Sequence, residues 1–126
     1  MAVNASFRSF VLEQLARVVP NLRSRGMFGG VGIYDGELFF ALIAGDTLYF
    51  SVDDGNRAGY EARGLGPFKP FEDHDEVMSY YAVDADTLEQ VDELREWSTK
   101  AIDAARRKKT ARRPTKQKKK SRKKRR

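Results

Sequence analysis

The feature that most constrains this fold is the apolar stretch from Met27 to Val52, which two turn signals divide into three runs. The signals are Asp35-Gly36 and Ala44-Gly45-Asp46. Short apolar runs joined by a dipeptide such as Asp-Gly are typical of β-hairpins. The stretch therefore predicts a three-stranded antiparallel meander, whose central strand, residues 37–43, has apolar residues on both faces.

The two outer runs of the meander differ in regularity. The glycines at positions 29, 30 and 32 weaken the first run and predict a bulge or a close approach of backbone. In the third run, Leu48, Phe50 and Val52 alternate with side chains that point the other way. This alternation is expected of a strand that buries only one face.

An amphipathic helix is predicted before the meander, from Ser6 to Val19, where apolar residues recur every three or four positions. Asn4 or Ser6 is suited to cap its first turn. Pro20 disfavours a helical conformation at Val19, so the helix is expected to end there.

The chain after the meander predicts a short helix, two strands and a final helix. Asp53 or Asp54 is expected to cap the short helix, which runs through Ala62 and is closed by Gly64. The strands are expected over residues 68–71 and 77–83. Asp84 or Asp86 begins the last helix, with Asp86 and Glu89 at capping-box spacing and a buried stripe of Leu94, Trp97, Ala101 and Ala105. The element order α-β-β-β-α-β-β-α predicts an α+β fold in two layers, an antiparallel sheet with helices packed on it.

Charge divides the chain after residue 105. Of the 24 basic residues, 15 lie from Arg106 onward with no acid among them, which leaves 9 basic and 18 acidic residues in the preceding part. We therefore expect an acidic folded domain over residues 1–105 and a Lys/Arg-rich tail over residues 106–126. The tail has too few apolar side chains to offset chain entropy and is expected to be disordered when free.

The tail predicts sequence-independent contact with nucleic acid, because clustered cations release the counterions of a polyanion. It has no aromatic residue to stack on bases. The alternatives are a solubilising tail or one that folds back on its acidic domain. The candidate nucleic-acid-binding residues are Arg106, Arg107, Lys108, Lys109, Arg112, Arg113, Lys116, Lys118, Lys119, Lys120, Arg122, Lys123, Lys124, Arg125 and Arg126.

Catalytic and metal signatures are weak, so we predict a non-enzymatic protein with no catalytic residue, cofactor or resident metal. The glycines at 29–32 are not followed by a Gly-Lys-Ser/Thr phosphate loop. His74, among the acids of residues 72–76, suggests a divalent-cation site or a proton-transfer group, but adjacent turn residues splay apart, and a solvated turn is the favoured interpretation. Ser51 and Ser79 have no nucleophile-elbow context.

The expected location is the cytoplasm, with association to the nucleoid as an option. The chain has no cysteine, no uninterrupted apolar region of a signal peptide and no apolar run long enough for a membrane span.

Several side chains have both a structural and a partner-binding interpretation. Arg23 and Arg25 are expected to be solvated or paired with the domain's own acids, and the alternative is that they face a partner. Four tyrosines are predicted to lie on the sheet face or its edge, where core packing is favoured over dimerisation: Tyr34, Tyr49, Tyr80 and Tyr81.

The run MFGGVGIY at residues 27–34, followed by MSYY at 78–81, resembles the N-terminal domain of the TfoX/Sxy family. The segments at residues 60–64, 67–68 and 94–97 resemble the same pattern in the same order, and the resemblance spans residues 7–106. It implies a two-layer fold of the secretion-chaperone-like kind, which often forms homodimers. Full-length members are regulators of bacterial competence that act as transcriptional coactivators, and we expect this chain to have the basic tail in place of their second domain.

Two functional hypotheses follow. The first is a regulatory, competence-type or transcription-associated protein whose tail tethers it to DNA or RNA. The second is a protein-binding or chaperone-like assembly module whose tail only improves solubility.

Overall fold

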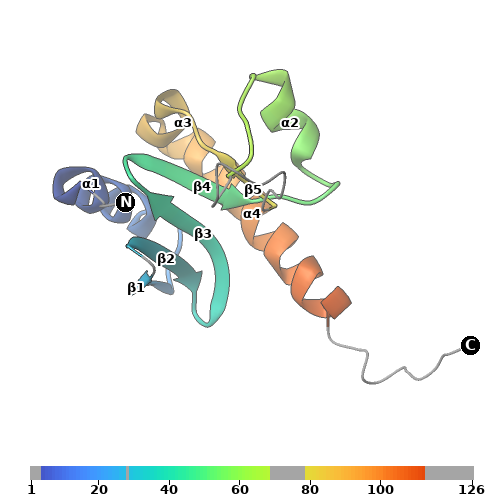
Figure 1. Ribbon diagram of the computed structural model, residues 1–126, viewed down its shortest axis with the longest axis horizontal. Coiled ribbons are helices and arrows are strands. Elements are labelled where there is room, and N and C mark those ends of the chain that lie inside the picture. The colour runs from blue at the N-terminus through green and yellow to red at the C-terminus, as the bar shows by residue number, and fades with distance from the viewer. Residues whose placement is uncertain (1–3, 28, 69–78, 113–126) are drawn as a thin grey trace, which may run out of the picture.

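The computed structural model describes residues 4–27, 29–68 and 79–112 of the 126-residue chain. The described chain forms an antiparallel sheet and a layer of helices, which Figure 1 shows with their labels. The helices are α1 (Ala5–Ala16), α2 (Arg57–Ala62), α3 (Ala85–Glu89) and α4 (Val91–Arg112). The strands are β1 (Leu22–Met27), β2 (Gly30–Asp35), β3 (Leu38–Ala44), β4 (Thr47–Ser51) and β5 (Tyr80–Ala82).

The predicted meander is confirmed as β2, β3 and β4, which pair in sequence order with β3 at the centre of the sheet. Gly36 and Gly45 begin the two short turns with positive φ angles of 65° and 63°. A residue with a Cβ atom adopts this conformation only at a cost, so the turn signals in the sequence have a direct structural basis.

The sheet also contains a strand that the sequence did not predict as one. β1 pairs with β2 along its whole length, from Leu22 opposite Asp35 to Met27 opposite Gly30. The register shift of β2 lies between Ile33 and Tyr34, later than the glycine run where a bulge was expected.

This register shift places an extra residue, Phe40, in β3, because Ile33 pairs with Ala41 and Tyr34 pairs with Phe39. Phe40 is fully buried in the core. Phe39 packs instead against Tyr34, with ring centroids 5.3 Å apart. The bulge thus sends two consecutive phenylalanines into different surroundings.

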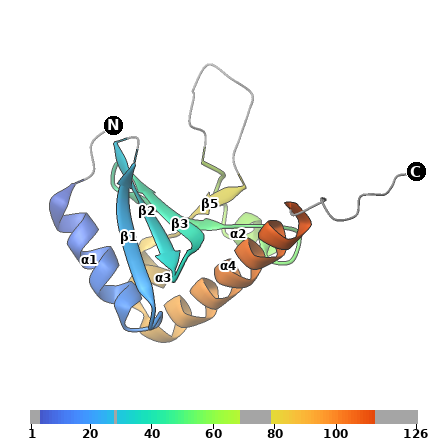
Figure 2. The same ribbon diagram turned by 90° about the horizontal axis from the view of Figure 1, so that it is seen from below.

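One face of the sheet carries the core, and Figure 2 shows α1, α3 and α4 along that side. The predicted inward residues are confirmed, since Leu48 and Phe50 in β4 and Val52 just after it are all buried. From the helices, the core includes Val11, Leu15, Tyr60, Leu88, Leu94, Ala101 and Ala105. The predicted stripe of the last helix is thereby confirmed, with Trp97 packed against the same cluster.

The observed ends of α1 agree with the sequence prediction only in part. Asn4 caps α1 as expected, because its side chain accepts a hydrogen bond of 3.0 Å from the Phe7 N–H. The helix ends at Ala16, earlier than predicted, since Val18 and Val19 donate to the carbonyl of Leu15 in a tightened last turn. Pro20 therefore does not directly follow α1, because Arg17, Val18 and Val19 lie between the helix and the proline.

The last helical region is divided. Asp84 caps α3 by accepting from the Thr87 N–H, and the capping box expected between Asp86 and Glu89 is not used at this helix start. Gln90 has an extended conformation and separates α3 from α4. No proline or glycine marks this break in the sequence, so periodicity alone did not find it.

The strands predicted over residues 68–71 and 77–83 are only partly within the described chain. β5 corresponds to the second of them and pairs with β4. Of the first, only Phe68 is described; its N–H donates to the carbonyl of Tyr80, and the neighbouring Pro67 bridges to Tyr81. Residues 69–71, 77 and 78 lie outside the described residues.

The disorder predicted from Arg106 onward is wrong for the first seven residues of that segment, because α4 continues through Arg112. Arginine, lysine and alanine have high helix propensity, and cations are favoured near a helix C-terminus because its dipole is negative there. Residues 113–126 lie outside the described residues. None of the described helices is long and apolar enough to cross a membrane.

Candidate nucleic-acid interface

The candidate interface begins at the C-terminal end of α4, which contains the first cations of the basic segment. This end of the helix extends past the sheet in Figure 1 and is held there by contacts to residues distant in sequence. Those contacts determine which cations are available to a polyanion.

Arg107 is anchored to the loop after β4 by a bidentate ion pair. Its Nε donates to Asp53 Oδ2 at 2.6 Å, and a terminal nitrogen donates to Asp53 Oδ1 at 2.8 Å. Two parallel charge-assisted hydrogen bonds of this kind are among the stronger and more directional polar contacts in proteins. The pair joins residues 54 positions apart and fixes the last turns of α4 against the body.

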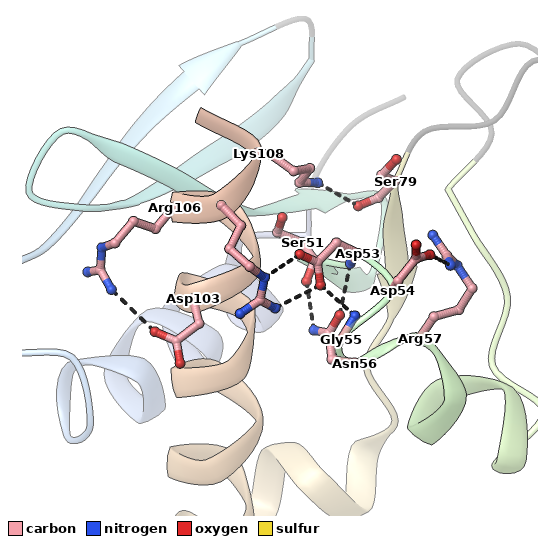
Figure 3. A network of polar contacts seen from close by, with 11 residues as sticks. Ser51, Asp53, Asp54, Gly55, Asn56, Arg57, Ser79, Asp103, Arg106 and Lys108 are labelled. Carbon is pink, nitrogen blue, oxygen red and sulfur yellow. Dashed lines mark hydrogen bonds and ion pairs between the residues drawn. The ribbon is translucent and has the colours of Figure 1, made fainter. Parts of the chain in front are cut away.

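The loop that holds Asp53 is itself ordered by short-range hydrogen bonds, which Figure 3 shows. Asp53 Oδ1 also accepts from the Gly55 N–H at 2.9 Å. The Asn56 side chain accepts from the Asp53 N–H and donates to the carbonyl of Ser51. The Asp53 carboxylate is therefore pre-oriented toward the helix before Arg107 reaches it.

This arrangement corrects the helix-cap prediction for Asp53 and Asp54. Asn56 occupies the N-cap position of α2 without a side-chain cap, and the Asp53 carboxylate is used by Arg107 and Gly55. Asp54 pairs with Arg57 at the surface. The sequence contained no local signal for the Asp53–Arg107 contact, because a residue-pair contact over this separation leaves no periodic pattern.

The electrostatics agree with the geometry. The hydrogen bond from Arg107 is the main cause that lowers the pKa of Asp53 from 3.8 to about 2, and burial opposes this change while the Gly55 N–H supports it. The same hydrogen bond raises the pKa of Arg107. The pair is thus fully ionised over the physiological pH range.

Lys108 is the second anchor. Its Nζ donates to the carbonyl of Ser79 at 3.0 Å and lies 4.5 Å from the centroid of the Tyr80 ring. A cation at this distance from a ring face is attracted by the ring quadrupole. Lys108 therefore ties α4 to the start of β5.

The neighbouring cations, Arg106 and Lys109, are held less firmly by the folded body. Arg106 pairs at 3.2 Å with Asp103 on its own helix, and both side chains are about half exposed, so the pair is worth little and is easily exchanged for another anion. Lys109 is exposed and lies three positions from Arg106, on the same side of the helix. The structure thus divides the four predicted binding residues 106–109 into two that contact other elements of the body, Arg107 and Lys108, and two exposed residues that are not held by another element of the described chain, Arg106 and Lys109.

The remaining predicted binding residues are not all described. Arg112 closes α4, and the ten cations from Arg113 to Arg126 lie outside the described residues. Arg107 and Lys108, which were predicted to bind nucleic acid, contact Asp53 and Ser79 of the folded domain, and their contact with nucleic acid stays a prediction.

Other candidate sites gain no support from the described chain. His74 and its neighbouring acids at residues 72–76 lie outside the described residues. Across residues 4–27, 29–68 and 79–112, no group of three or more His, Cys, Asp or Glu side chains is placed to hold a metal ion. Ser51 lies buried within β4.

The contacts of Arg63 join helices of the folded domain and do not form a candidate binding site. The guanidinium carbon lies 4.4 Å from the Trp97 ring centroid, and its nitrogens donate to Thr87 at 2.7 Å and to Glu93 at 3.1 Å. These contacts join the end of α2 to α3 and α4.

Comparison with known families matches the chain to the TfoX N-terminal domain over residues 13–105. This confirms the resemblance noted in the sequence, and the antiparallel sheet with its helical layer is consistent with that domain. No curated protein matches the sequence significantly. The TfoX N-terminal domain family is not a known enzyme family.

Proposed function

Because the chain belongs to the TfoX N-terminal domain family, we propose that it is a regulatory protein without enzymatic activity, which its basic C-terminal segment tethers to nucleic acid. The observation that carries the proposal is the charge division, with 15 basic residues and no acid from Arg106 onward. A transcription-associated or competence-type role is part of the same proposal. The folded domain supplies the contacts to protein partners.

The contacts of α4 support a tether rather than a cationic segment neutralised by its own domain. Arg107 and Lys108 contact the nearby acceptors Asp53 and Ser79, and they hold the end of α4, which the remaining cations follow in the sequence. Arg106 and Lys109 stand exposed on one side of the helix end. Binding is expected to be independent of sequence, because phosphate contacts alone carry no base information.

The test compares duplex binding by the full chain and by a chain truncated after Arg112. Truncation after Arg112 keeps the contacts of Arg107 and Lys108 with the body. Truncation after Ala105 would remove both contacts, and a loss of binding could then result from a destabilised fold instead of from the missing cations. Ten cations lie beyond Arg112. If half of them meet phosphates, the slope of log affinity against log salt becomes shallower by about 4.5 in the truncated chain. Equal affinity and equal slope for the two chains would refute the tether.

The alternative is a protein-binding or assembly module with a solubilising tail. Phe10 is 38% exposed on α1, the largest exposed apolar side chain of the described residues, and it offers a contact to a protein partner. A pull-down before and after nuclease treatment separates the two proposals. Partners that persist without nucleic acid support the module, and partners that all disappear support the tether.

A further inference from the structure

The second face of the sheet carries a continuous stripe of aromatic rings with cations at both ends. Phe39 links the stripe, because its ring centroid lies 5.3 Å from Tyr34 and 5.5 Å from Tyr80. Arg25 lies 5.9 Å from the Tyr34 ring at one end, and Lys108 lies over the Tyr80 ring at the other. Tyr34 and Phe39 are half-buried and Tyr80 is buried, so the accessible part of the stripe is the end at Tyr34 and Phe39, beside Arg25.

Pairing and burial place these residues opposite the core. Ile33 faces the core and its neighbour Tyr34 faces away, directly across from Arg23 in β1. Arg23 and Arg25 are two positions apart in one strand, so they share a face. Tyr49 adds a second aromatic pair on this face, with its ring centroid 4.9 Å from that of Phe68.

The two arginines are available to an anion. Both are exposed, and neither forms an ion pair with a carboxylate of residues 4–27, 29–68 or 79–112. By contrast, Arg63 and Arg107 are both held by carboxylates of the body. An arginine guanidinium without such a partner is suited to bind phosphate through two of its donors.

Beside the arginines lies a hollow of about 300 Å³ with a mixed lining: Arg23, Ser24, Arg25, Tyr34, Gly36 and Glu37. The lining offers cations for a phosphate, a ring for a base, and the Glu37 carboxylate as a hydrogen-bond acceptor. A carboxylate repels phosphate, but it accepts a hydrogen bond from a ribose 2′-hydroxyl, which DNA lacks.

We infer that this face binds single-stranded RNA, with bases stacked on Tyr34 and Phe39, phosphates held by Arg23 and Arg25, and a ribose hydroxyl donating to Glu37. Unpaired bases stack on aromatic side chains of an open sheet, whereas the bases of a duplex are hidden from them. The surface is distinct from the tether proposed above and adds a preference that the tail alone does not have.

The test uses the full chain with four fluorescein-labelled probes at equal salt: a 12-nucleotide oligo-uridine, the matching oligo-deoxyuridine, and RNA and DNA duplexes of equal length. The unmodified protein is expected to prefer oligo-uridine over the other three. Tyr34→Ala is expected to weaken oligo-uridine binding roughly 5- to 150-fold, the range of one lost base stack, and to leave duplex binding unchanged. Tyr34→Phe, which retains the ring, is expected to bind normally.

Charge and ribose contacts are tested separately. The double variant Arg23→Gln/Arg25→Gln is expected to reduce the salt slope for oligo-uridine by about 1.4, because two phosphates lose their partners. Arg8→Gln/Arg17→Gln is the matched control, since it removes the same charge from exposed positions on or beside α1 and is expected to leave this slope unchanged. Glu37→Ala is expected to abolish the preference for uridine over deoxyuridine.

The outcomes separate this inference from the tether. If oligo-uridine and the duplexes bind equally and Tyr34→Ala changes nothing, the sheet-face site is refuted and the tether stands. Equal binding of oligo-uridine and oligo-deoxyuridine by the unmodified protein refutes the selection of RNA. If none of the four probes binds, the tether itself is refuted along with the site.

Discussion

Replacing Arg107 with glutamine is expected to destabilise the folded body, because it removes the ion pair that holds the end of α4. The pKa of Asp53 falls from 3.8 to about 2 in the folded protein. At about 1.36 kcal/mol per pKa unit, this corresponds to a ceiling of roughly 2.4 kcal/mol of stability at neutral pH. Arg107 is 55% exposed, and solvent screening together with the retained Gly55 hydrogen bond reduces the expected loss to about 1 kcal/mol.

The measurement is urea unfolding followed by the fluorescence of Trp97, the single tryptophan of the chain. With an m-value of about 2 kcal/mol/M, a loss of about 1 kcal/mol moves the midpoint down by about 0.5 M. Arg106→Gln is the matched control, because Arg106 pairs with Asp103 three positions away on the same exposed helix surface. Its expected effect is a few tenths of a kcal/mol. Equal midpoints for the Arg107 variant and the control would refute the anchor.

The pH dependence of this loss has a definite sign. Asp53 has a lower pKa in the folded than in the unfolded protein, so its contribution is fully present above about pH 5 and is lost as the pH falls through about 2. The stability difference between the unmodified protein and Arg107→Gln is therefore expected to shrink between pH 5 and pH 2. A difference that stays constant across this range would assign the loss to packing of the arginine side chain instead of its charge.

Gly55→Ala tests the Asp53–Arg107 ion pair by a change in the loop that holds Asp53. An added Cβ atom would lie 2.7 Å from a terminal nitrogen of Arg107, so the guanidinium must move away from Asp53. The expected loss is again about 1 kcal/mol or less, because the end of a flexible side chain can retreat. In the Arg107→Gln background the same substitution is expected to cost almost nothing, and additive losses would show that the loop itself is strained.

Three further substitutions test the helical layer, each by its urea midpoint. Tyr60→Phe is expected not to lower the free energy of unfolding and to raise it by up to about 1 kcal/mol, because the buried hydroxyl finds no hydrogen-bond partner within residues 4–27, 29–68 and 79–112. Gly59→Ala is expected to raise it by about 0.5–1 kcal/mol, since the position is helical and the new Cβ meets Trp97 at an ordinary 3.6 Å. Arg63→Ala is expected to lower it by about 1–2 kcal/mol through loss of the stacking on Trp97 and of the hydrogen bond to Thr87.

The parts of the fold that the sequence predicted are those with a local physical signal. The turns at Gly36 and Gly45 need a positive φ angle that glycine adopts readily. The alternation around Phe50 and the cap at Asn4 likewise depend on a few adjacent residues. These turns, the alternation and the cap could therefore be predicted without knowledge of the rest of the structure.

The sequence did not predict β1 as a strand, because its own residues have only a weak preference for strands. Its inward positions include Ser24 and Gly26, and its outward positions are Arg23 and Arg25. Pairing with β2 supplies the hydrogen bonds that fix this segment as a strand. Tertiary context of this kind commonly overrides weak β propensity.

The same limit applies to the candidate site, and it explains why the sequence did not predict that α4 continues into the basic segment. Composition changes at Arg106, but the fold does not, since Arg107 and Lys108 complete the body through Asp53 and Ser79. A charge count treats all 15 cations alike, whereas a buried or pre-oriented carboxylate selects one of them by geometry. Cations of one run therefore differ in their surroundings: Arg107 and Lys108 contact the folded domain, and we propose that the cations after them contact phosphate.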